Sequence, residues 1–120
     1  MTEERRQFHR ISFDAPAELS QNNLHGISEI IDISLKGILI KSTDLPFDHD
    51  LPVSISIRLN HETYIEMTAD WSNSKNNADA YHWTQVDIES LSTLRRLLEL
   101  NTGNEDLIER ELSKLGTFDN

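Results

Sequence analysis

The stretch GISEIIDISLKGILIK (residues 26–41) decides the fold of this chain. Its first half alternates, with Ile27, Ile31 and Ile33 on one face, and predicts a half-buried β-strand over 26–33. Its second half is a short apolar run that predicts another strand over 37–41. Between them lies a break typical of a turn, because Asp and Ser bond to nearby backbone groups and Gly accepts a positive φ. The sequence therefore predicts a β-hairpin with a turn or bulge at 35–37.

Further strands surround this hairpin in the sequence. Four more segments are extended or alternate between apolar and polar residues: 13–19, 53–59, 63–71 and 80–87. Pro16 favours an edge position for the first of them. Residues 72–79 are polar throughout and predict a plain loop. About six short strands at this spacing favour a small antiparallel β-barrel.

The last third of the chain changes from a strand pattern to a helical one. A stripe of leucines predicts a helix over 90–101, with Leu91, Leu94, Leu97 and Leu98 on one face. Gly103 is typical of a helix end, and Asn104 is a capping residue for a second helix. The expected organisation is a flexible basic arm (1–10), a β-barrel (11–89) and C-terminal helices packed on or beside it (90–116). The predicted class is mainly β (α+β), a six-stranded antiparallel barrel with one or two C-terminal α-helices.

Charge is the most informative feature of the composition. Eleven Lys and Arg against twenty-one Asp and Glu give a net charge of −10 over 120 residues. Residues 1–10 carry +1, which leaves −11 for the remainder. An acidic body repels polyanions, so we expect no DNA or RNA partner. No apolar run approaches the roughly 20 residues of a membrane helix, and residues 1–10 lack the apolar centre of a signal peptide. We expect a cytoplasmic protein without membrane insertion.

The sequence contains no catalytic pattern. Its five histidines lie singly, without the spacing of metal ligands, and cysteine is absent. Its four glycines cannot form a phosphate-binding loop, and no nucleophile elbow occurs. We therefore predict that the chain is not an enzyme and holds neither a metal nor a cofactor.

Two weak motifs gain meaning when they occur together. Arg6 and Arg10 form R-x-x-x-R, while Asp32, Ser34 and Gly37 form D-x-S-x-x-G. Taken singly, the first is a solvated terminus and the second is turn chemistry. Their combination, with the second motif straddling a hairpin in a β-rich chain, resembles the PilZ domain, the bacterial receptor module for cyclic di-GMP. The resemblance covers essentially the whole chain.

The resemblance implies a six-stranded barrel with a C-terminal helix and a cyclic di-GMP site that includes these five motif residues. The opening FHRISFD (8–14) and the tail 90–101 resemble the single-domain members of the family. One departure is Asp79-Ala80-Tyr81, where members often carry a glycine early in the last strand. In the family, an arginine directly before the R-x-x-x-R motif accompanies capture of a stacked ligand dimer, so Arg5 implies that mode here.

The chemistry of the motif residues suits this ligand. Arginine donates two hydrogen bonds to guanine O6 and N7 and pairs with phosphate. An Asp32 carboxylate accepts from guanine N1–H and N2–H₂, donors that adenine lacks, so cyclic di-AMP should be rejected. Ser34 is expected to donate to a phosphate or base edge, and Gly37 to keep a Cβ out of the ligand's path. Trp71 has two interpretations, stacking on a guanine or packing in the core.

The expected mechanism is that the ligand orders the arm and changes the surface shown to an unidentified downstream protein. The alternative is a PilZ-like adaptor that works by protein contact without nucleotide. An oligonucleotide-binding barrel is a third class, but its aromatic and basic groove is missing from the sequence.

Overall fold

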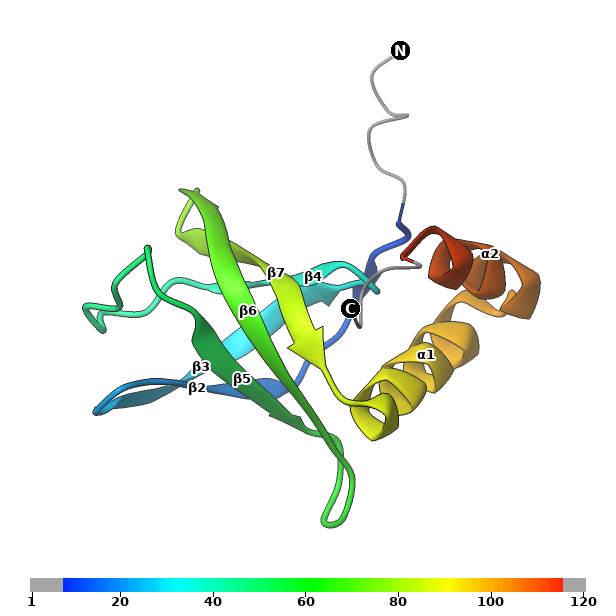
Figure 1. The fold of residues 1–120 in the computed structure, drawn as a ribbon, viewed down its shortest axis with the longest axis horizontal. Helices are drawn as coiled ribbons and strands as arrows, with labels where there is room; N and C mark the ends of the chain where they lie inside the picture. The colour runs from blue at the N-terminus through cyan, green and yellow to red at the C-terminus, as the bar shows by residue number, and fades with distance from the viewer. Residues whose placement is uncertain (1–7, 116–120) are drawn as a thin grey trace.

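The structure, a computed structural model, describes residues 8–115, and of Leu115 it describes the backbone only. Seven antiparallel strands form one sheet in the order β1-β3-β2-β5-β6-β7-β4. A further pairing of β3 with β4 closes six of them into a barrel, and β1 adds to β3 outside the ring (Figure 1). The strands are β1 (Ile11–Ser12), β2 (Pro16–Gln21), β3 (Leu24–Ile33), β4 (Gly37–Lys41), β5 (Val53–Arg58), β6 (Tyr64–Lys75) and β7 (Ala78–Val86). The predicted six-stranded barrel is confirmed.

The barrel interior is filled by alternate residues of the strands. In β5, Val53, Ile55 and Ile57 are buried while the residues between them face outward. In β3 the prediction chose the wrong face, because Ile30 is buried whereas Ile27 is 68% exposed. A register shift between Ile30 and Asp32 then brings Ile33 into the core. One extra residue in a strand moves every later side chain to the opposite face.

Strand β2 lies inside the sheet, so the predicted edge position was wrong. It pairs with β3 on one side and with β5 on the other. Pro16 is its first residue. A proline is tolerated there because the start of a strand is one of the few places where the sheet can do without an N–H donor.

Residues 72–79 form a hairpin rather than the predicted loop. Strand β6 continues to Lys75, and β7 begins at Ala78. The two residues between them, Asn76 and Asn77, have φ values of 55° and 64°. A two-residue hairpin turn needs positive φ at both positions, and asparagine tolerates that conformation better than most residues. The polar composition concealed this turn because the strands on either side are exposed.

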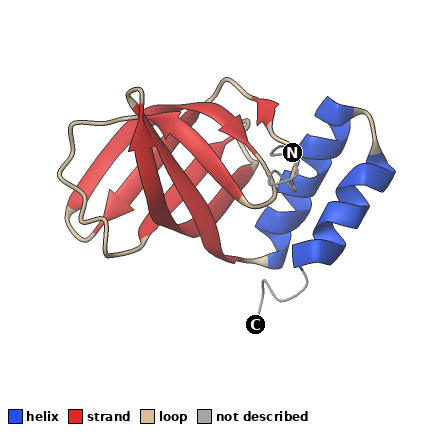
Figure 2. Cartoon of the chain, turned by 90° about the horizontal axis from the view of Figure 1, so that it is seen from above, coloured by secondary structure: helices blue, strands red, loops and turns tan. Residues whose placement is uncertain are grey.

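Two antiparallel helices cover one end of the barrel (Figure 2). Helix α1 spans Ile88–Thr102, and α2 spans Glu105–Leu115, so both predicted helices are confirmed. Asp87 caps α1 by accepting from the Ser90 N–H, and Gly103 ends it at φ 69°. Leu94, Leu98 and Ile108 are fully buried. Neither helix is long and apolar enough to cross a membrane.

Candidate functional site

The turn that links β3 to β4 is held by a buried serine. Ser34 is 4% exposed, and its Oγ accepts the backbone N–H groups of Lys36 at 3.1 Å and Gly37 at 3.2 Å. Its own N–H donates to the Gly37 carbonyl at 2.9 Å. The Ser34 oxygen therefore stabilises the turn. The expectation that its hydroxyl donates to a ligand remains a prediction.

Strand β7 fixes the same turn from the side. The indole Nε1 of Trp83 donates to the Ser34 carbonyl at 3.2 Å, and its backbone N–H donates to the Lys36 carbonyl at 2.9 Å. Trp83 is 4% exposed, as expected for a core residue. The motif turn is therefore a rigid part of the barrel wall.

Gly37 is required by crowding and not by its own backbone angle. A Cβ added there would lie 2.2 Å from the Tyr81 carbonyl oxygen and 3.0 Å from the His82 Cα. Among the glycines in residues 8–115, positive φ occurs at Gly103 alone, so the predicted positive φ at Gly37 was wrong. The glycine lets β4 approach β7 more closely than any side chain would permit.

Arg10 and Asp32 are brought together by the pairing of β1 with β3. Ile11 lies opposite Ile33 and Ser12 opposite Asp32. The Arg10 Nη1 is 3.9 Å from the Asp32 Oδ1. That oxygen is buried and has no hydrogen-bond partner within residues 8–115. A buried acceptor without a hydrogen bond is costly, so pairing this oxygen with a donor would stabilise the site.

The β3 bulge is what turns Asp32 outward. By strict alternation Asp32 would share the inward face of Ile30. The register shift between these two residues leaves Ile33 fully buried and the Asp32 side chain 19% exposed. The bulge therefore places the carboxylate on the outer surface, within reach of Arg10.

Strands β4 and β7 continue the sheet beside Asp32. Asp32 lies opposite Leu39, which lies opposite Ala80. Gly37 lies opposite His82, whose exposed ring bonds through Nδ1 to the Ser72 Oγ at 2.9 Å. The sequence analysis missed His82, although its alternation with Ala80 along β7 could have indicated it. The sheet therefore runs from Asp32 of β3 across β4 to His82 of β7.

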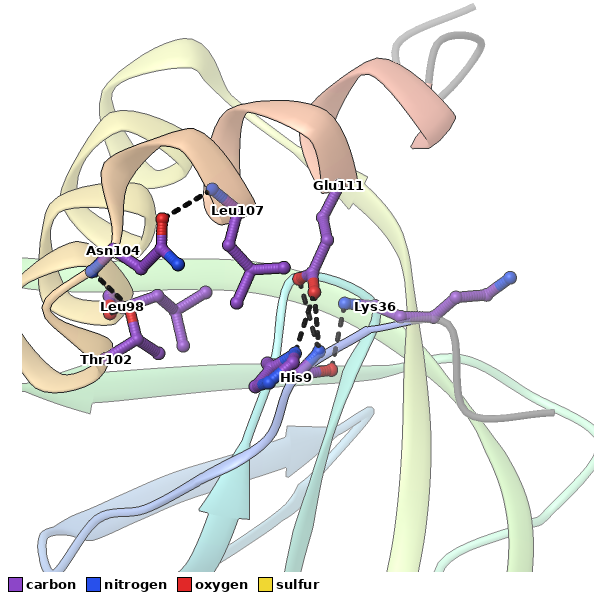
Figure 3. Close-up of polar contacts among 8 residues, drawn as sticks. His9, Lys36, Leu98, Thr102, Asn104, Leu107 and Glu111 are labelled. Atoms are coloured by element: carbon purple, nitrogen blue, oxygen red, sulfur yellow. Dashed lines mark hydrogen bonds and ion pairs between the residues drawn. The ribbon is translucent and has the colours of Figure 1, made fainter. Parts of the chain in front are cut away.

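The beginning of the described chain packs against this turn. Phe8 is half-buried, and the Lys36 Nζ lies 5.6 Å from its ring centroid, a cation–π contact. The backbone N–H and ring Nδ1 of His9 contact the Glu111 carboxylate of α2, which Figure 3 shows reaching down to His9 beside Lys36. The sequence analysis predicted neither the contact of Lys36 with Phe8 nor that of Glu111 with His9. Arg5 and Arg6 lie outside the described residues.

Trp71 lies away from Arg10 and Asp32. Its ring stacks on His49 with centroids 3.8 Å apart, and its Nε1 donates to the Ser74 Oγ at 3.0 Å. It lies opposite Tyr81, which lies opposite Ile38 of β4. The structure brings together Arg10, Asp32, Ser34 and Gly37. Stacking of Trp71 on a guanine remains a prediction.

Two other features bear on the chemistry of the site. Burial, together with the nearby Asp79 carboxylate, raises the pKa of Tyr81 to about 12, so this phenol stays neutral at ordinary pH. No group of three metal-binding side chains occurs in the described part of the chain.

A hollow of about 1080 Å³ lies on another wall of the barrel, lined by residues such as Glu18, Ser54 and Thr68 and by none of the motif residues. We assign the site by its chemistry and not by its depth.

Comparison with known proteins identifies the family and supports the fold. The PilZ domain family model matches residues 4–100. The PilZ domain of YcgR from Escherichia coli, solved with c-di-GMP, has a TM-score of 0.62 at 14% identity over 94% of this chain and 98% of that one. The PilZ domain of CeSA from a cellulose-synthesising bacterium has a TM-score of 0.60 at 20% identity over 79% of this chain and 96% of that one.

A third similar structure is the Bacillus subtilis inhibitor of motility, MotI/DgrA. It has a TM-score of 0.60 at 21% identity over 79% of this chain. The match covers 52% of that protein, so this chain spans about half its length. At these identities the likeness of the three structures establishes a shared fold.

Proposed function

The chain belongs to the PilZ domain family, and from that premise we propose that it is a cytoplasmic receptor for cyclic di-GMP without catalytic activity of its own. The observation that carries the proposal is the pair formed by Arg10 and Asp32 at 3.9 Å, with the buried Asp32 Oδ1 accepting no hydrogen bond from any of residues 8–115. The similar PilZ domain of YcgR was solved with c-di-GMP, which supports the same ligand class here.

The pair offers complementary chemistry to a guanine. The Arg10 guanidinium donates to guanine O6 and N7 or to a phosphate, and the Asp32 carboxylate accepts from N1–H and N2–H₂. Hydrogen bonds to charged groups contribute about 1.5–3 kcal/mol each, and micromolar affinity needs about 8 kcal/mol net. Two such residues therefore do not suffice. Arg5 and Arg6 would supply further contacts, with Arg5 favouring a stacked dimer of the ligand.

The same contacts would make the arm a switch. Arginines on a terminal segment gain fixed partners when phosphates and guanines arrive, which offsets the roughly 1–2 kcal/mol of backbone entropy for each residue ordered. Ordering of the N-terminal arm by the ligand would then change the surface that a downstream protein contacts. Binding and signalling become a single event in a domain without an active site.

A calorimetric titration of the full chain with cyclic di-GMP, repeated with cyclic di-AMP, tests the proposal. We expect cyclic di-GMP to bind at least about 100-fold more tightly, because one frustrated base contact costs roughly 1–3 kcal/mol and two bases are recognised. Tryptophan fluorescence in the same titration reports whether Trp71 is contacted. Equal affinities would contradict the assigned contacts, and absence of binding would favour the adaptor alternative.

A further inference from the structure

A buried carboxylate in α2 contacts the arginine motif. Glu111 is 2% exposed, and its two oxygens lie 3.2 and 3.0 Å from the backbone nitrogen of His9. Its Oε2 also lies 3.1 Å from the His9 Nδ1 (Figure 3). A carboxylate is costly to bury unless it is paired and hydrogen-bonded. Both donors come from one residue, so the position of residue 9 relative to α2 is specified by the fold.

His9 lies inside the R-x-x-x-R motif, next to Arg10. On the other side of Arg10, Ile11 is paired with Ile33 of β3. Arg10 is thus the single residue between two anchors, one supplied by α2 and one by the sheet. With both neighbours fixed, the backbone of Arg10 has a defined position, and its Nη1 lies 3.9 Å from the Asp32 Oδ1.

The packing of α2 explains why Glu111 reaches this point. Ile108, one turn earlier on the same face, is fully buried. Glu109 lies on the other side, 66% exposed, and contacts Arg95 of α1 at 3.7 Å. Helix α1 is itself tied to the barrel, because the Ser90 Oγ accepts the Glu66 N–H at 2.9 Å. The carboxylate is therefore presented by a braced helix pair.

We propose that Glu111 is a positioning residue for nucleotide binding, which holds the segment of His9 and Arg10 so that Arg10 meets the ligand already facing Asp32. This inference rests on the proposed function as a cyclic di-GMP receptor. It assigns a binding role to α2, which lies beyond the residues 4–100 that the family model covers. Pre-ordering this segment lowers the entropy that the ligand must otherwise supply.

A purely structural role for Glu111 predicts a different pattern of coupling. If Glu111 only packs α2, its loss weakens binding by the same factor whether or not Arg10 is present. If Glu111 acts through Arg10, its loss has little effect once Arg10 has been removed. A double-mutant cycle between the two residues separates these cases.

The experiment measures cyclic di-GMP affinity by calorimetry for the wild type, Glu111→Gln, Arg10→Ala and the double variant. Gln keeps the shape of Glu but turns an amide NH₂ toward one of the two His9 donors. We expect Glu111→Gln to weaken binding about tenfold, as the loss of one charge-assisted bond predicts. In the Arg10→Ala background the same change should alter affinity less than twofold. The control Glu109→Gln, on the same helix, should also stay within twofold of the wild type.

Each result decides the proposal. Unchanged or tighter binding by Glu111→Gln, or a tenfold loss that persists without Arg10, overturns the positioning role while leaving the receptor function in place. Absence of wild-type binding overturns the receptor function and this inference with it. If Glu111→Gln lowers the melting temperature appreciably, His9→Ala replaces it. That change removes the ring contact and keeps the backbone N–H, so a loss of about threefold supports the proposal and an unchanged affinity overturns it.

Discussion

Two turns on neighbouring strands of this barrel are built in opposite ways. The turn at 34–37 is crowded and begins with two buried residues, with the Ser34 oxygen accepting two backbone N–H groups and Trp83 bonded to two of its carbonyls. The turn at Asn76 and Asn77 is exposed and rests on two positive φ angles. The first turn is specified by its surroundings, whereas the second is specified by the backbone preferences of its own residues.

Tyr81 of β7 connects the two turns. Its carbonyl oxygen is the atom that a Cβ on Gly37 would strike. The Asp79 carboxylate disfavours ionisation of the Tyr81 phenol. That carboxylate accepts hydrogen bonds from Ser42 at 3.1 Å and from Ser74, near the exposed 76–77 turn. A substitution in the 34–37 turn therefore tests how far stability depends on packing. A substitution in the 76–77 turn tests how far it depends on the local backbone conformation.

The largest effect is expected for Gly37→Ala. The new methyl group would meet the backbone of β7, which cannot move without separating β4 from β7. We expect a loss of about 3 kcal/mol in the free energy of unfolding, measured by urea denaturation. Gly26→Ala is the matched control, because its methyl group meets the flexible end of the Leu45 side chain. Equal losses in the two variants would show that crowding at the 34–37 turn is not special.

Arg10→Ala should weaken cyclic di-GMP binding by about 2 kcal/mol, the value of one hydrogen bond to a charged group. Its effect on stability should be below about 1 kcal/mol, because the Arg10 side chain is 38% exposed and its ion pair with Asp32 is long. Calorimetry and urea denaturation on the same sample measure the two quantities. Arg96→Ala on the exposed face of α1 is the control and should bind normally.

A smaller loss of stability is expected at alkaline pH, where Tyr81 ionises. Its pKa is raised to about 12 in the folded chain, above its ordinary value of 10.0, because burial and Asp79 disfavour the phenolate. The unfolded chain then loses the proton first, so stability should fall as pH rises from about 10 to about 12. The urea midpoint of Tyr81→Phe should fall less over this window. Parallel curves for the two proteins would contradict the assignment.

The smallest effects are expected at the exposed turn. Asn77→Ala places a residue with a Cβ at φ 64° and should cost about 1 kcal/mol. Asn77→Gly should be neutral within about 0.5 kcal/mol, because glycine adopts this angle freely. Thermal unfolding followed by circular dichroism compares both with the wild type. A loss for Asn77→Gly as large as that for Asn77→Ala would mean that the asparagine side chain, and not its backbone angle, is what matters.

The sequence predicted the barrel and helices well because those features depend on local patterns. A short apolar run located β4, alternation located β5 and β7, and the leucine stripe and capping residues located α1 and α2. The prediction failed where a local pattern has two solutions. The inward face of β3 was assigned wrongly because Ile30, Ile31 and Ile33 offer apolar residues to both faces. The polar stretch 72–79 was taken for a loop because exposed strands carry no apolar alternation.

The sequence by itself determined the class of the protein, because strand periodicity, helix caps and the two motifs are properties of short segments. Only the tertiary structure decided the site. The β3 bulge turns Asp32 outward, the β1 pairing brings Arg10 to it, and the carboxylate of Glu111, 102 residues along the chain, holds His9 in place. Such contacts join segments far apart in sequence, and their register is set by how the whole core packs, which no local pattern records.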